Sequence, residues 1–311
     1  MFILTEKTNL EHLDATITQL RLFNETIPIY VITPPKTSQN HPKRLDVIYI
    51  PLEKLKKTTV HQKYLHHIIK NPANSQQISE NFFCLESLII QRHLHNVFYL
   101  DDNVLIYTDL SKLLPVFKKN YPGMAASFDN EERCQPSFIF ISNRDSLKKC
   151  TEFLFEQSKR NTDPKKALFL FKNKYGKNTL DSLPILTEEY FNDHSSRIFS
   201  NQIVRKKDFF FNNIKQFGSL FDPALMGKFI ESSEKENRPD AVFQPSYCKI
   251  SFEEDKEGRK IPFLNYKDKK IPINNLFVSE KNMEKYLSRS PVKEKKQLTT
   301  KLDYDSHRPK K

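Results

Sequence analysis

The chain has 311 residues, a net charge of +12 and a hydrophobic content of 38%. A chain of this length is expected to form one large or two small domains, and its apolar content suffices for a buried core. No apolar stretch reaches the length of a membrane span, and the polar residues that follow Leu4 argue against a signal peptide. We therefore expect a cytoplasmic protein.

The cysteines lie far apart and form no CxxC pair; they are Cys84, Cys134, Cys150 and Cys248. Such spacing is typical of reduced thiols in the cytosol and argues against a zinc site. The segment from Glu53 to Ser79 is rich in histidine, with His61, His66 and His67. No carboxylate supports these histidines, so a metal site is not expected there.

The positive charge favours anionic partners such as nucleotides, phosphates, nucleic acid or acidic membrane surfaces. Part of the charge lies in residues 289–311, which are basic and have no periodic apolar face. We predict a disordered tail there, beyond a domain that spans residues 1–288. Nucleic acid is an unexpected partner, because the chain has no zinc finger, no RNA-recognition signature and no dense aromatic–basic interleaving.

The first part of the chain alternates between short apolar runs and an amphipathic segment. The expected elements are a strand at Phe2–Leu4, a helix at Leu10–Phe23 capped by Asn9, and strands at Pro28–Thr33 and Leu45–Pro51. This βαβ alternation predicts a single α/β domain with a Rossmann-type, mostly parallel central sheet flanked by helices.

The alternation continues to the end of the predicted domain. The expected helices are Glu80–Leu94, Leu110–Lys119 behind the cap Asp109, Asp145–Ser158, Pro164–Tyr175, one that starts at Asp222 and Pro223, and Glu280–Leu287. The expected strands are Val97–Leu100, Met124–Ala126, Ser137–Ile141, Ser246–Phe252 and Ile271–Val278.

An apolar run, Val97–Leu100, leads directly into Asp101, Asp102 and Asn103, and apolar residues then resume up to Tyr107. A buried strand that ends in carboxylates places them at the carboxyl edge of the sheet, where open α/β sheets bind ligands. Closely spaced oxygen donors suit a hard divalent cation bound to a phosphate. The alternative is an acidic turn that water solvates.

Four segments stand out in chain order. They are Gln19–Asn24 with the strand Ile29–Ile32, Phe82–Glu86 with Val97–Tyr107, Leu220–Ile230, and Ile273–Asn282. In this order they resemble the nucleotide-diphospho-sugar transferases of the GT-A fold, as a divergent member of a bacterial and viral branch. The resemblance spans residues 2–288 and implies a GT-A-like glycosyltransferase that moves a sugar from a nucleotide-diphosphate sugar to an acceptor.

The resemblance also implies a metal site. Asp101, Asp102 and Asn103 would form a DxD-like motif that holds Mn²⁺ or Mg²⁺ on the diphosphate of the donor. Such a cation screens the charge that develops on the leaving diphosphate. Asn275 and Lys281 would contact the donor as well, since a lysine binds phosphate oxygens as a point charge.

By the same resemblance, Asp222 would be the catalytic residue and would orient or deprotonate the acceptor hydroxyl. Each assignment has a structural alternative. Asp222 is also a suitable helix N-cap, Lys281 is one of many lysines, and Asn275 suits a turn together with Asn274.

Several positions depart from the family pattern. Asn103 stands in place of the final aspartate, Phe277 and Ser279 replace two histidines, and Asn81 replaces an arginine. An amide binds Mg²⁺ or Mn²⁺ less well than a carboxylate, and a phenyl ring does not bind them. The expected metal site is therefore weak, and a catalytically degenerate nucleotide- or glycan-binding protein is the alternative function.

Overall fold

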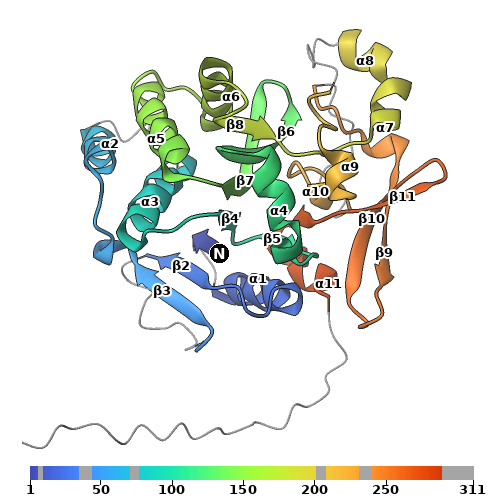
Figure 1. Cartoon of the computed structure of the whole chain (residues 1–311), viewed down its shortest axis with the longest axis horizontal. Coiled ribbons are helices and arrows are strands. Elements are labelled where there is room, and N and C mark those ends of the chain that lie inside the picture. The colour runs from blue at the N-terminus through green and yellow to red at the C-terminus, as the bar shows by residue number, and fades with distance from the viewer. Residues whose placement is uncertain (6–9, 35–43, 71–76, 201–207, 231–239, 289–311) are drawn as a thin grey trace, which may run out of the picture.

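The computed structural model describes residues 1–5, 10–34, 44–70, 77–200, 208–230 and 240–288 (Figure 1). The predicted basic tail, 289–311, and the predicted cap Asn9 lie outside the described residues. Within this part of the chain, no helix combines the length and the apolar character needed to cross a bilayer. The four cysteines carry free thiols.

The central sheet has seven strands in the order β3-β2-β1-β4-β7-β6-β8. Their bounds are β1 Phe2–Thr5, β2 Ile29–Thr33, β3 Val47–Pro51, β4 Val97–Asp101, β6 Met124–Asn130, β7 Arg133–Ile141 and β8 Leu180–Ser182. Strand β7 is antiparallel to both of its neighbours, and the other neighbouring pairs are parallel. The predicted mostly parallel central sheet is confirmed.

The α-helices account for a large share of the remaining described residues. Their bounds are α1 Leu10–Phe23, α2 Thr59–Lys70, α3 Gln77–Arg92, α4 Leu110–Asn120, α5 Arg144–Ser158, α6 Pro164–Tyr175, α7 Glu188–Asp193, α8 Ser195–Ser200, α9 Ile214–Phe217, α10 Met226–Ile230 and α11 Met283–Tyr286. Helix α4 begins where the sequence predicts a cap. The side chain of Asp109 accepts a hydrogen bond from the backbone N–H of Ser111 at the start of this helix.

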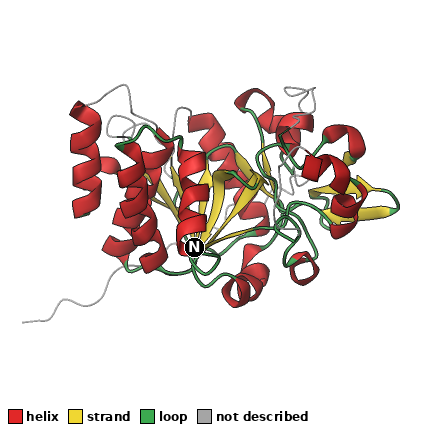
Figure 2. Cartoon of the chain, turned by 90° about the horizontal axis from the view of Figure 1, so that it is seen from above, coloured by secondary structure: helices red, strands yellow, loops and turns green. Residues whose placement is uncertain are grey.

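Helices cover both faces of the central sheet (Figure 2). Successive side chains of a strand point to opposite faces, so Phe98 and Leu100 of β4 enter one core while Val97 and Tyr99 enter the other. The first core packs against α1 and α4, and the second packs against α3, α5 and α6. Because β4 is buried on both faces, its end is held rigidly in the centre of the molecule.

Two smaller sheets follow from the C-terminal part of the chain. Strands β9 (Lys249–Glu254), β10 (Lys260–Tyr266) and β11 (Lys269–Pro272) form an antiparallel sheet beside the main body (Figure 1). Strand β12 (Asn275–Phe277) pairs with β5 (Val104–Ile106). The single strand predicted at Ile271–Val278 is thus wrong, because the chain leaves β11, bridges Leu220 at Ile273 and then joins a different sheet.

Gln19 of α1 fastens the end of the described chain to the middle of the molecule. Its buried amide nitrogen donates to the carbonyl oxygen of Ile106 (2.9 Å) and to Oγ of Ser288 (3.2 Å). Its Oε1 accepts the backbone N–H of Ser288 (2.8 Å). Gln19 therefore has a structural role, and it links α1, β5 and the last residues before the tail.

We predict that Gln19→Leu lowers the free energy of unfolding by about 1–3 kcal/mol, because it leaves the buried N–H of Ser288 and the carbonyl of Ile106 without a partner. Urea denaturation of the two proteins measures the difference. Gln62→Leu on the exposed side of α2 is the matched control and should stay within about 0.5 kcal/mol of the wild type. Equal losses in the two variants would show that Gln19 does not fasten the C-terminal end.

Candidate functional site

The strand-end acids lie at the carboxyl edge of the central sheet. Asp101 ends β4 and pairs with Thr5 at the end of β1. Asp101 and Asp102 are only 8% and 6% exposed, although neither lies in an apolar core. A carboxylate that is so far removed from water depends on hydrogen-bond donors or on a bound cation.

A chain of hydrogen bonds orients the Asp101 carboxylate. The hydroxyl of Tyr99 donates to Oδ1 of Asp101 (2.6 Å), and the amide of Asn81 on α3 donates to the Tyr99 oxygen (2.9 Å). Residues 99 and 101 share one face of β4, so the strand itself sets this contact. Asn81, one of the departures from the family pattern, therefore acts on the acid motif through Tyr99.

The acid motif meets the last motif of the sequence through backbone pairing. Strand β5 starts directly after Asn103 and pairs antiparallel with β12, with Phe277 opposite Val104. The carbonyl oxygen of Asn103 then accepts the backbone N–H of Val278 (3.0 Å). The two segments that carry the predicted donor contacts thus lie side by side at the end of β4.

The segment that contains Asp222 joins the same place. The backbone N–H of Leu220 donates to the carbonyl of Pro272 (2.9 Å), and the N–H of Asn274 donates back to the carbonyl of Leu220 (2.8 Å). The Asn274 amide also donates to Oγ of Ser219 (2.7 Å). Parts of all four segments that carry the family resemblance therefore meet at β5 and β12, the first of them through the hydrogen bond from Gln19 to Ile106.

Asp222 is fully buried and serves as a clamp between α10 and β12. Its Oδ1 accepts the N–H groups of Leu225 and Met226, and its Oδ2 accepts those of Gly227 and Phe277, at 2.8–3.2 Å. Burial raises the pKa of the Asp222 carboxyl, and the four backbone donors oppose that rise. Asp222 thus binds backbone N–H groups at the start of α10, but it lies four residues before the first helical residue and is not the predicted N-cap, while contact with an acceptor stays a prediction.

Gly227 makes the close packing of α10 on β12 possible. A Cβ atom at this position would lie 2.0 Å from the carbonyl oxygen of Phe277. The helix itself starts at Met226 instead of at the predicted Pro223, because Ala224 has a left-handed backbone with φ of 57°. The short segment between Asp222 and α10 therefore wraps around the carboxylate.

Several buried polar atoms near this sheet edge and on β12 have no hydrogen-bond partner among the described residues. They are Oγ1 of Thr33, Oγ of Ser127, Oδ1 of Asn103, and both amide atoms of Asn275. Thr33 is the last residue of β2. Ser127 lies on β6, one residue after Ala126, and both Ala126 and Tyr99 of β4 pair with Ile139 of β7. Unpaired buried groups of this kind call for a ligand or ordered water.

The sequence predicts Asn103 and Asn275 at this site, but it gives no sign of Thr33 or Ser127. A single hydroxyl residue at the end of a strand is too common to indicate a site, and only the sheet order reveals that both hydroxyls share an edge with Asp101.

Lys281 lies in the short helical turn Glu280–Asn282, three residues after Val278, and its side chain is exposed to solvent.

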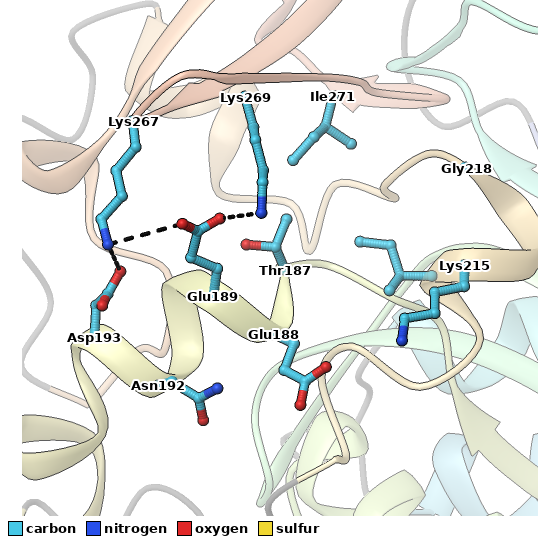
Figure 3. A pocket seen from close by; sticks show the side chains of 11 residues that line it. Thr187, Glu188, Glu189, Asn192, Asp193, Lys215, Gly218, Lys267, Lys269 and Ile271 are labelled. Atoms are coloured by element: carbon cyan, nitrogen blue, oxygen red, sulfur yellow. Dashed lines mark ion pairs between the residues drawn. The ribbon is translucent and has the colours of Figure 1, made fainter.

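A separate pocket of about 670 Å³ lies between α7 and the β10–β11 turn (Figure 3). Four of its charged residues form ion pairs: Lys267 contacts Asp193 (2.5 Å) and Glu189 (3.8 Å), and Lys269 contacts Glu189 (2.5 Å). The hydrogen bond from Lys267, followed by one from Tyr266, lowers the pKa of Asp193. The sequence did not predict this pocket, because its lining comes from three separate stretches of the chain.

No known family model and no curated protein matches the sequence. Solved structures that are similar to the chain in fold include three glycosyltransferases. The apo form of mouse xyloside xylosyltransferase 1 shares 8% identity at a TM-score of 0.41, with 68% of this chain and 92% of that chain covered. The galactosyltransferase LgtC, in complex with donor and acceptor sugar analogs, shares 12% sequence identity with this chain at a TM-score of 0.38. The match covers 63% of this chain and 78% of that chain. The glycosyltransferase GlyE of Streptococcus pneumoniae TIGR4 shares 16% sequence identity with this chain at a TM-score of 0.38. The match covers 65% of this chain and 50% of that chain.

We predict that Asp222→Asn lowers the free energy of unfolding by about 1–3 kcal/mol, because the new NH₂ group faces backbone N–H donors where an acceptor is needed. Chemical denaturation measures this loss. Asp193→Asn, at an exposed carboxylate of α7, is the control and should cost less. A stable Asp222→Asn protein would contradict the clamp and would favour the catalytic assignment.

Proposed function

We propose that this protein is a glycosyltransferase that moves a sugar from a nucleotide-diphosphate sugar to an acceptor, with the donor bound at the end of β4. The observation that carries the proposal is the convergence of the four family-like segments on β5 and β12. Backbone hydrogen bonds join residues 103 and 278, 274 and 220, and 107 and 274. Segments that merely resembled a family by composition would have no reason to meet in the fold.

The residues at the end of β4 fit a divalent cation. The side chains of Asp101, Asp102 and Asn103 provide oxygen ligands, which Mg²⁺ and Mn²⁺ prefer. Oδ1 of Asn103 is buried without a hydrogen-bond partner among the described residues. A bound cation would neutralise charge on the diphosphate as it leaves. Tyr99 and Asn81 hold the Asp101 carboxylate in one orientation, which reduces the cost of organising the site.

Lys281 and Asn275 would complete the donor contacts from the other motif. The exposed ammonium group of Lys281 would bind phosphate oxygens, and the unpaired amide of Asn275 offers both a donor and an acceptor. These contacts require no metal.

A nucleotide- or glycan-binding protein without transfer activity is the second candidate function. It is favoured by the amide of Asn103, which stands where the family pattern has a carboxylate.

A thermal-shift screen with UDP-, GDP-, CMP- and dTDP-sugars, each with and without Mn²⁺, tests the proposal. We expect one class of sugar nucleotide to raise the melting temperature, and Mn²⁺ to increase the effect in the wild type but not in Asp101→Asn. Release of the free nucleoside phosphate then separates transfer or hydrolysis from binding. If no sugar nucleotide stabilises the protein, the donor site does not exist.

We predict that Lys281→Ala weakens binding of the sugar nucleotide by roughly 10- to 100-fold, the effect of losing one charge-assisted contact. Calorimetric titration with the donor identified by the screen measures the affinity. Lys118→Ala, at an exposed lysine in the last turn of α4, is the matched control and should leave the affinity unchanged. Equal affinities in both variants would remove Lys281 from the site.

We predict that Asn103→Asp raises the affinity for Mn²⁺ in the presence of the sugar nucleotide, because a carboxylate is a stronger ligand than an amide. Adding Ser279→His to this variant should raise it further, since Ser279 follows Val278, the residue that hydrogen-bonds to Asn103. Asn192→Asp on the exposed side of α7 adds the same charge elsewhere and is the control. Tight Mn²⁺ binding by the wild type without nucleotide would show that the site is not weakened.

A further inference from the structure

A second group of metal-ligating side chains lies between α2 and α3, away from the strand-end acids. His61 comes from α2, and Glu80 and Cys84 lie one turn apart on α3. One ligand atom from each residue lies within 4.8 Å of the other two. His61 and Cys84 are buried, at 0% and 4% exposure, and Glu80 is half-buried.

The hydrogen bonds of His61 fix which ring nitrogen is available. Its Nδ1 lies 3.1 Å from Oγ of Ser87, and the Ser87 hydroxyl donates its own hydrogen to the carbonyl oxygen of Phe83 (2.9 Å). With the Ser87 hydrogen directed at Phe83, Nδ1 carries the ring proton and donates it to Ser87. Nε2 then presents a lone pair, and it is buried with no hydrogen-bond partner among the described residues.

This arrangement is the one that metal-bound histidines commonly show. A ligating imidazole usually donates its second N–H to an oxygen, which sets the tautomer and the ring orientation. Burial, followed by the positive charge of Lys57, lowers the pKa of His61 to about 4, so the ring is neutral near pH 7. The ring is also held in place by Phe83, whose ring lies 5.8 Å from it.

We propose that His61, Glu80 and Cys84 bind a borderline divalent cation of the zinc class. One imidazole, one thiolate and one carboxylate suit Zn²⁺ better than Mg²⁺ or Mn²⁺, and three protein ligands leave a fourth position for water. Tetrahedral bonds of about 2.0–2.3 Å place the ligand atoms of one cation about 3.3–3.6 Å apart, so the three side chains must draw together by up to roughly 1.5 Å on binding.

The charges balance in this buried place. On binding, the Cys84 thiol gives up its proton to solvent, and the thiolate and the Glu80 carboxylate then neutralise the two charges of the cation. Burial and the neighbouring Glu80 raise the pKa of Cys84 to about 12 in the absence of a cation, and Lys57 opposes that rise. The nearby ammonium of Lys57 works against the cation, so the affinity depends on all three ligands.

The site has a structural consequence for the acid motif. A cation at this place would tie the first turn of α2 to the first described residues of α3. Glu80 is the direct neighbour of Asn81, which holds Tyr99 and through it Asp101. The inference goes beyond the proposed function, because it concerns different ligands and a different class of metal.

Titration of the whole protein with Co²⁺ and with Zn²⁺ tests the inference. We expect Co²⁺ to give a thiolate charge-transfer band that Zn²⁺ abolishes. The band should vanish in Cys84→Ser and persist in Cys248→Ser, which removes a half-buried thiol elsewhere. A wild type without this band, or a band that survives Cys84→Ser, overturns the proposal.

Calorimetry with Zn²⁺ tests the other ligands. Affinity should fall at least tenfold in His61→Gln and Glu80→Gln, and roughly 10- to 100-fold in Ser87→Ala, which keeps the ligands but removes the acceptor of the His61 N–H. His66→Gln, at an exposed histidine of the same helix, should bind as the wild type does. If Cys84→Ser does not fold, Glu80→Gln and Ser87→Ala decide, and wild-type affinity in both overturns the site.

Discussion

The backbone pairing of β5 is the interaction on which the candidate site depends. This strand has only three residues, and all of them are buried. Buried N–H and C=O groups must find partners, and here they come from distant parts of the chain: β12 pairs along β5, Gln19 donates to Ile106, and Asn274 accepts from Tyr107. The acids are therefore held in position by the pairing of the strand that follows them.

The same region keeps polar atoms away from water without giving them partners within the described protein. Each such atom costs about 1–3 kcal/mol when it stays unpaired. Thr33, Ser127, Asn103 and Asn275 carry this cost. By contrast, Asp222 at the neighbouring clamp has four donors. The contrast separates a buried carboxylate that stabilises the fold from buried polar atoms that gain no hydrogen bond within the described residues.

Much of the central sheet could be predicted from the sequence, because strands buried on both faces give continuous apolar runs and the helices between them have periodic faces and caps. The direction of β7 could not be predicted, since an apolar run carries no information on the direction of its strand. Strand β10 was missed because lysines and a charged turn surround its apolar residues. Asp222 shows a further limit: a cap and a catalytic acid have the same local sequence.

The cluster around His61 shows why a set of metal ligands from two helices could not be predicted from the sequence. The histidine-rich helix α2 contains no acid, and Cys84 has no second cysteine nearby. The partners of His61 come from another helix, where Glu80 and Cys84 share a face only because four residues make about one helical turn. The signal that could have found them is this spacing on α3 together with the packing of α2 on the same face.

The pairing of β5 with the C-terminal segment also affects how the protein can fold while it is being synthesised. The hydroxyl of Tyr107, next to β5, donates to the carbonyl of Tyr286, and the two residues are separated by 179 positions. A ribosome that adds about 5–20 residues per second needs roughly 10–35 s to cover that distance. Throughout this time the nascent chain carries its acid motif without the strand that holds it in place. A chain terminated before Asn275 would therefore keep the strands of the central sheet but lack the pairing of β5 with β12.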